Sequence, residues 1–279
     1  LVPMKKTILY FFFFLSNSGY AQKYEIIDSV DYSYYYNYEF QEDSTRQSSI
    51  QSCEMILQTG KTTSLFTSVS YLYVDSLLYA FKDEPTDVAA MKILPYIQGI
   101  RQHAYCKYHI YKNFPEEDVS TFINTVDGKN FRVSNENKMQ WELVQDSDTV
   151  LLGYNCLKAK TRFAGRNYEA WYSPEIPVSD GPYKFSGLPG LIVSISDTQN
   201  QHSFKLEGIS KSDAGKPIVF IRKDYLNVSA EEYTDALNAR MARLFNRVQQ
   251  ENNIQFNSDE AKARALDRLK SRNNFIEIY

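Results

Sequence analysis

The sequence lacks the residue patterns from which the commonest active sites are built. Its 279 residues include only 3 histidines and 3 cysteines. It contains no HExxH, GxSxG, Walker loop or GxGxxG, so the usual zinc-protease, serine-hydrolase and nucleotide sites are not indicated. No two cysteines form CxxC, which argues against a thioredoxin-like redox motif. We therefore assign no catalytic residue and expect neither a metal nor a cofactor.

A surplus of basic charge and flexible linkers are also missing. The 31 Lys and Arg residues stand against 34 Asp and Glu, a net charge of −3, so nucleic acid is not a favoured partner. We find no Gly/Ser linker, no low-complexity tract and no internal repeat. Beyond the first residues, no apolar run approaches the roughly 20 residues that span a bilayer. We expect a single domain over residues 22–279, without a transmembrane segment.

The first residues do carry the pattern of a secretory signal. Lys5 and Lys6 precede a short apolar run, and small residues lead up to Ala21. This order of basic, apolar and small residues is typical of a cleaved signal peptide. We expect residues 1–21 to be that peptide. Met4 is its expected start site, and residues 1–3 lie upstream of that site. A buried N-terminal helix is the alternative.

Tyrosine is abundant, with 22 residues, and it favours strands. Because side chains alternate across a strand, residues 32–40 put five rings on one face. These rings are Tyr32, Tyr34, Tyr36, Tyr38 and Phe40. The face is either a platform for a sugar or another flat ligand, or the core face of a half-buried strand.

Residues 156–173 predict a hairpin with one consistent register around a two-residue turn at Ala164-Gly165. In this register Lys160 faces Glu169 and Lys158 faces Trp171, both favourable pairs. The other face pairs Leu157 with Tyr172, Ala159 with Ala170, and Thr161 with Tyr168.

The same register places Cys156 on a face with Lys158, Lys160 and Arg162. Nearby cations would lower the pKa of its thiol. The alternative is a disulfide or an inert thiol. Spacing does not determine which of Cys53, Cys106 and Cys156 pair.

Other segments complete the expected fold. Hairpin turns are predicted near residues 59–61 and at Asp127-Gly128, and a strand over residues 138–144. A short helix over residues 87–94 should stop before Pro95. Ser229 and Glu232 form a capping box that opens a helix with an apolar stripe, and a second helix should follow over residues 258–272. The end, NNFIEIY, is strand-like.

These elements predict an α+β fold. We expect a large curved antiparallel sheet, predominantly β, with two C-terminal helices packed against it.

The stretch GPYKFSGLPGLIVSISD from Gly181 concentrates glycine and proline before an apolar strand. Pro189 suits the second position of a type II turn, and Gly190 suits the third, where φ is positive. Local physics therefore explains the turn without a ligand. The proline-rich residues 173–185 before it either cover a sheet edge or shape a pocket.

With its neighbours, this stretch resembles the signature of the GLPGLI family of exported proteins, described mainly from Bacteroidetes. The matching segments include GYNCLKA, GRNYEAWYSPEIPVSDGPYKF and GLPGLI, whereas Phe275 replaces a usual proline in the ending. The resemblance implies the periplasm or outer envelope of a Gram-negative bacterium and no known activity. The residues that carry it are Gly153, Tyr154, Cys156, Gly165, Arg166, Gly181, Pro182, Gly187, Leu188, Pro189, Gly190, Leu191, Ile192 and Asp197.

Three functions are compatible with the sequence. The first is a binding or carrier module for an apolar or aromatic-stacking ligand. The second is an accessory protein that docks on an outer-membrane partner, favoured if Ile176, Tyr183 and Phe185 form an exposed patch. The third is a hydrolase using Cys156 with His202, or two of Glu169, Glu175, Asp180 and Asp197. The candidate residues for ligand or partner binding are Tyr34, Tyr36, Trp171, Tyr172, Ile176, Tyr183 and Phe185.

Overall fold

The computed structural model describes residues 23–100, 106–212, 215–250, 258–270 and 273–277. The predicted signal peptide, residues 1–21, lies outside the described residues and stays a prediction. Among the helices that are described, none combines the length and the apolar composition needed to cross a membrane.

Strands dominate the part of the chain that the structure describes. They are β1 (Lys23–Ser29), β2 (Tyr32–Gln41), β3 (Ile50–Thr59), β4 (Ser64–Ser68), β5 (Tyr108–Lys112), β6 (Val119–Val126), β7 (Lys129–Glu136), β8 (Glu142–Leu151), β9 (Tyr154–Phe163), β10 (Arg166–Ser173), β11 (Leu191–Asp197), β12 (His202–Lys211), β13 (Pro217–Arg222) and β14 (Tyr225–Asn227). The helices are α1 (Val69–Ala80), α2 (Thr86–Ile100), α3 (Ala230–Gln250) and α4 (Asp259–Lys270).

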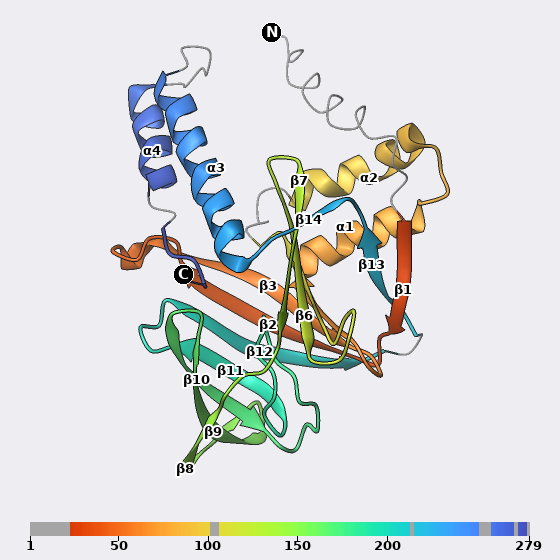
Figure 1. Ribbon diagram of the computed structural model, residues 1–279, viewed down its shortest axis with the longest axis vertical. Helices are drawn as coiled ribbons and strands as arrows, with labels where there is room; N and C mark the ends of the chain where they lie inside the picture. The colour runs from red at the N-terminus through yellow and green to blue at the C-terminus, as the bar shows by residue number, and fades with distance from the viewer. Residues whose placement is uncertain (1–22, 101–105, 213–214, 251–257, 271–272, 278–279) are drawn as a thin grey trace.

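Twelve strands form one sheet in the order β14-β7-β6-β5-β4-β3-β2-β12-β11-β10-β9-β8, and β1 pairs separately with β13. The sheet curves through the molecule, with the α1–α2 and α3–α4 helix pairs lying apart above it in Figure 1. The predicted α+β, predominantly β fold is confirmed. The sheet is mixed rather than wholly antiparallel, because β14 runs parallel to β7.

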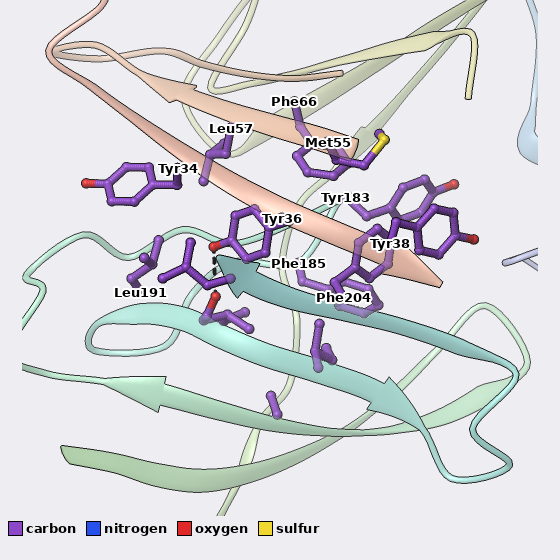
Figure 2. Packing of buried hydrophobic residues seen from close by; sticks show 14 of the residues in the cluster. Tyr34, Tyr36, Tyr38, Met55, Leu57, Phe66, Tyr183, Phe185, Leu191 and Phe204 are labelled. Atoms are coloured by element: carbon purple, nitrogen blue, oxygen red, sulfur yellow. Dashed lines mark hydrogen bonds between the residues drawn. The ribbon is translucent and has the colours of Figure 1, made fainter. Parts of the chain in front are cut away.

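The tyrosine-rich strand β2 lies in the middle of the sheet and presents its alternate rings to the core. Tyr34, Tyr36 and Tyr38 are buried, and the Tyr36 hydroxyl donates to the Ile192 carbonyl at 2.8 Å (Figure 2). Tyr38 stacks on Phe204 of β12 with ring centroids 4.1 Å apart. The alternation therefore makes a core face and not an exposed aromatic platform.

The β9–β10 hairpin has the predicted register at every position. Lys160 pairs with Glu169 and Lys158 with Trp171, and the three pairs predicted on the other face are also present. Ala164 and Gly165 both have positive φ, 44° and 80°, as a type I′ turn requires. The β6–β7 turn at Asp127-Gly128 has the same form.

Three local predictions were wrong. The helix expected to stop before Pro95 continues through it as α2, since an internal proline removes one backbone hydrogen bond without ending the helix. Of the strand predicted over residues 138–144, residues 138–141 are not a strand, and β8 begins only at Glu142. The described part of the C-terminal stretch, residues 273–277, is not a strand either.

The C-terminal helices form where they were predicted. Ser229 and Glu232 make both hydrogen bonds of the capping box, at 2.7 and 3.1 Å. Near the start of α3, Tyr233 packs on Phe122 of β6 and Phe131 of β7. Farther along, α3 packs against α4, and the pair extends away from the sheet in Figure 1. The contact with the sheet is therefore made by the first turns of α3.

Candidate functional site

The loop between β10 and β11, residues 174–190, is here called the motif loop, and it fills the core. Tyr183, Phe185 and Leu188 are all buried. The Phe185 ring lies 4.7 Å from the Tyr168 ring and 5.3 Å from the Phe163 ring. Ile176 is buried as well, so the exposed apolar patch considered for Ile176, Tyr183 and Phe185 does not exist.

A buried lysine anchors the motif loop to the sheet. Lys112 of β5 is only 2% exposed. Its Nζ donates to the Asp180 carboxylate, to the Gly181 carbonyl at 2.5 Å and to the Phe185 carbonyl at 3.1 Å. Burial lowers the pKa of Lys112, while the Asp180 carboxylate opposes that shift. One ammonium thus compensates the Asp180 charge, to which the Gly181 N–H also donates at 2.7 Å, and satisfies two carbonyl oxygens of the buried loop.

Two glycines of the motif loop, Gly181 and Gly190, are needed for close approach of the backbone to its neighbours. Gly190 has a φ of +149°, and a Cβ there would lie 2.2 Å from the Ser173 carbonyl oxygen. A Cβ on Gly181 would lie 2.8 Å from Ile192. The positive φ of Gly190 was predicted correctly, but the turn type was not. The Gly190 N–H donates to the Leu188 carbonyl at 2.8 Å, a three-residue turn around Pro189 in place of the type II turn.

Of two other residues of the resemblance, Arg166 and Asp197, Arg166 holds the C-terminal segment and Asp197 pairs with Arg166. They form a buried ion pair at 2.9 Å. Arg166 also donates to the Phe275 carbonyl at 2.8 Å and to the Asn274 side chain at 2.5 Å. The Asn273 and Asn274 N–H groups also donate to the Glu42 carbonyl, so this segment is held by both side-chain and backbone hydrogen bonds without forming a strand.

The opposite face of the sheet carries a shallow groove of about 330 Å³ across β10, β11, β12 and β2. We call it the serine groove, because Ser194, Ser196 and Ser203 line it. These three small side chains lie between longer ones on the flanking strands. The other lining residues are Glu39, Phe40, Gln41, Ile50, Glu169, Trp171, Asn200, Gln201 and Lys205.

The pairing of the strands explains the shape of the serine groove. Trp171 pairs with Ser194 and Glu169 with Ser196, while Ser194 pairs with Lys205 on the other side. Alternate residues of β11, such as Val193 and Ile195, are buried in the core. Strand β11 therefore serves the core with one face and the groove with the other.

The serine groove places an aromatic ring beside charged side chains, a combination that can bind a polar ring. Trp171 is half-buried, and Lys158 Nζ lies 5.5 Å from the centroid of its ring. Glu169 accepts from Lys158 at 2.8 Å and pairs with Lys160 at 3.4 Å, and these contacts lower its pKa. Glu169 is therefore an ionised acceptor at neutral pH and not a proton donor.

The serine hydroxyls are available to a ligand. Within the ranges that the structure describes, none of the three forms a hydrogen bond with another protein group. Each hydroxyl can donate one hydrogen bond and accept two. The groove thus offers one aromatic side chain, fixed charges and three free hydroxyls.

A family of unknown function matches the centre of the chain. Residues 108–194 match the model described as "Protein of unknown function (Porph_ging)". No curated protein matches the chain. Two solved structures are similar, "Structure of PNGF-II in C2 space group" and "Structure of PNGF-II in P21 space group". Each is 14% identical, with TM-scores of 0.49 and 0.48, and the match covers 76% of this chain but only 34% of theirs.

The nucleophile pair considered for a hydrolase is not assembled. The Cys156 thiol donates to the Tyr154 carbonyl at 3.4 Å, whereas His202 Nδ1 is hydrogen bonded to the Tyr38 hydroxyl at 2.7 Å. The prediction that Cys156 shares a face with Lys158, Lys160 and Arg162 was wrong. Its side chain is in the core, and burial raises the pKa of the thiol.

The acidic residues near the motif loop do not form a pair either. Each has a different partner: Glu169 the two lysines, Glu175 the Asn155 amide, Asp180 Lys112, and Asp197 Arg166. Carboxylates committed to separate partners do not form the facing acid and base that glycoside hydrolysis requires.

The structure places the candidate binding residues in two environments. Trp171 lines the serine groove. Tyr34, Tyr36, Tyr172, Ile176, Tyr183 and Phe185 are buried in the core. Sequence reasoning missed the serines, although residues 193–196 alternate between apolar side chains and serine. That alternation was the available signal for a second, polar face.

Proposed function

We propose that this protein is a binding module that holds a hydroxyl-rich ring, such as a sugar, in the serine groove. The observation that carries the proposal is the row of unpartnered serine hydroxyls beside the half-buried Trp171. An aromatic side chain offers a flat apolar surface for the less polar face of such a ring. The hydroxyls and Glu169 supply acceptors and donors along its edge.

The resemblance to the GLPGLI family supports an envelope setting for this module. In this proposal residues 1–21 are removed on export, and the mature protein begins at Gln22. N-terminal sequencing of protein recovered from the envelope of its source cells tests this. An intact N-terminus preceding Ala21 on the mature protein would contradict export by cleavage.

The ligand test uses a panel of soluble oligosaccharides, with binding measured by saturation-transfer NMR and titration calorimetry. Trp171→Ala should weaken any ligand found by about tenfold or more, the loss of roughly 1.4 kcal/mol of binding free energy. The matched control is Tyr35→Ala, because Tyr35 is an exposed aromatic of β2 that does not line the groove. It should change affinity less than twofold.

A second variant fills the groove without removing the ring. Ser196→Phe places a large side chain on the floor, so it should abolish binding while leaving the melting temperature nearly unchanged. The proposal fails if the panel yields no ligand, or if binding persists unchanged in both the Trp171 and Ser196 variants.

A second candidate function is docking on an envelope protein through α1 and α2. The observation that favours it is the exposure of Tyr73, Met91 and Tyr96, at 45%, 75% and 49%. The rings of Tyr73 and Tyr96 lie 5.9 Å apart, and exposed apolar side chains of this kind mark interaction surfaces. A photo-crosslinker placed at position 91 in the source cells should capture one envelope protein, and Tyr96→Glu should abolish that product. Capture that persists in Tyr96→Glu would contradict the docking role.

A further inference from the structure

Strand β4 is shorter than its neighbour β3, and two cysteines lie beside the place where β4 ends. Met55 of β3 pairs with Ser68, the last residue of β4, before the chain turns into α1. On the other side of β4, Thr67 pairs with His109. Continued to position 70, both registers place Cys53 and Cys106 at the same level, where β4 no longer separates β3 from the segment before β5.

Both side chains point into the same core. Cys53 and Cys106 belong to one buried cluster, together with Tyr38 and Tyr108, and are 6% and 3% exposed. The side chain and the backbone N–H of Cys106 lower the pKa of the Cys53 thiol, whereas Cys53 and burial raise the pKa of Cys106. Together with the common level and the shared buried cluster, this mutual effect makes the two side chains neighbours, and both are thiols in this structure.

We propose that Cys53 and Cys106 are a redox pair that closes to a disulfide, while Cys156 stays a free thiol. Cys156 lies on β9, and its thiol donates to the Tyr154 carbonyl at 3.4 Å. This assigns a pairing that cysteine spacing alone does not determine, and it accounts for the odd cysteine count.

The oxidation proceeds by thiol–disulfide exchange with the disulfide of an oxidoreductase or of oxidised glutathione. The Cys53 thiolate attacks one sulfur of the reagent and expels the other as a thiolate, which leaves a mixed disulfide. The Cys106 thiol loses its proton and attacks the Cys53 sulfur, which releases the second reagent thiolate. Two electrons and two protons pass from the cysteine pair to the reagent, which ends as thiols.

Closing this bond encloses α1 and α2. The link would tie β3 to the segment that follows α2, so both helices would lie inside one covalent loop. A loop of this length restricts the unfolded chain strongly, and the expected rise in melting temperature is roughly 10 °C.

The experiment refolds the full chain with oxidised glutathione or with a phosphine reductant, followed by alkylation and peptide mass mapping without reduction. Oxidised protein should be about 2 Da lighter, contain a Cys53–Cys106 linked peptide and carry alkylated Cys156. Cys156→Ser should retain the link and the rise in melting temperature. Cys53→Ser and Cys106→Ser should each lose both.

Two outcomes would overturn the proposal. One is a linked peptide that contains Cys156. The other is three alkylated cysteines after refolding with oxidised glutathione. The double variant Cys53→Ala/Cys106→Ala checks folding, because its circular dichroism spectrum should match that of the reduced protein. If it fails to fold, the mass map of the unaltered chain still decides.

Discussion

The motif loop and helix α1 differ in how far they bury their apolar residues. The motif loop is rich in proline and glycine, which is typical of a surface connection, and yet Tyr183 and Phe185 are buried. Helix α1 is rich in Leu, Val and Tyr, and yet none of its residues is buried. A helix satisfies its own backbone groups, whereas a loop can enter the core only if other groups satisfy them. Lys112 does this for the motif loop, so a buried charge accompanies the irregular backbone.

The largest effect should come from removing that charge. Lys112→Met leaves the Asp180 carboxylate buried and uncompensated, so the free energy of unfolding should fall by about 3–5 kcal/mol. The control on α2 is Lys92→Met, which breaks an exposed ion pair with Glu84 and should cost about 0.5 kcal/mol or less. Urea denaturation measures both. Equal losses would mean that the motif loop is not anchored by Lys112.

Substitutions of two methionines compare the core with the exposed helix α2 without changing any charge. Met55 of β3 is fully buried, and Met91 of α2 is 75% exposed. Met55→Ala should lower the free energy of unfolding by about 3 kcal/mol, because it opens a cavity in the core. Met91→Ala should change it by about 0.5 kcal/mol or less. A large loss at Met91 would show that another surface covers α2 in solution.

Substitutions at two glycines with positive φ distinguish the cost of backbone strain from the cost of steric crowding. Gly190→Ala should lower the free energy of unfolding by about 2–3 kcal/mol. The new Cβ would clash with the Ser173 carbonyl, and alanine would have to adopt the unfavourable φ of this position. Gly153→Ala, at a φ of +82° with nothing within 4 Å of the Cβ, should cost only about 1 kcal/mol. Thermal unfolding gives both values. Similar costs at the two sites would argue that the motif loop gives way to the added methyl group.

The buried region should also give a dependence of stability on pH, with no effect at neutral pH. Burial, and secondarily Arg166, lower the pKa of His202 to about 3. In the unfolded chain the pKa is about 6.5, so the unfolded state binds a proton first as the pH falls. The stabilisation is present above about pH 6.5 and is lost toward pH 3, by about 2 kcal/mol between pH 6.5 and 5. Urea titrations of His202→Gln should show a flatter profile, and an unchanged slope would exclude this origin.

The sequence predicted those parts of the fold that depend on neighbouring or directly paired residues. The β9–β10 register followed from Lys160, Glu169 and the Ala164-Gly165 turn, because each pair tests the same alignment. The capping box at Ser229 is likewise local. Helix α1 was missed even though Ser68 caps it, because its apolar residues surround the helix and leave no amphipathic stripe.

The candidate site was less accessible to sequence reasoning. Trp171 was singled out for its residue type, but the groove depends on β2 lying beside β12. That pairing joins residues 162 to 179 positions apart, and no local pattern specifies it. The buried contact between Lys112 and Asp180 joins residues 68 positions apart, so the sequence gives no local sign that this lysine belongs to the core.

Strand β11 places the residues that stabilise the fold on one face and the residues that a ligand would contact on the other. Positions 193 and 195 point inward and positions 194 and 196 outward, so changes at the outward positions need not disturb the interior. Variants that exchange those serines for other small polar residues could therefore alter which compound is recognised at little cost in folding. The same scaffold could in this way be adapted to a series of related molecules.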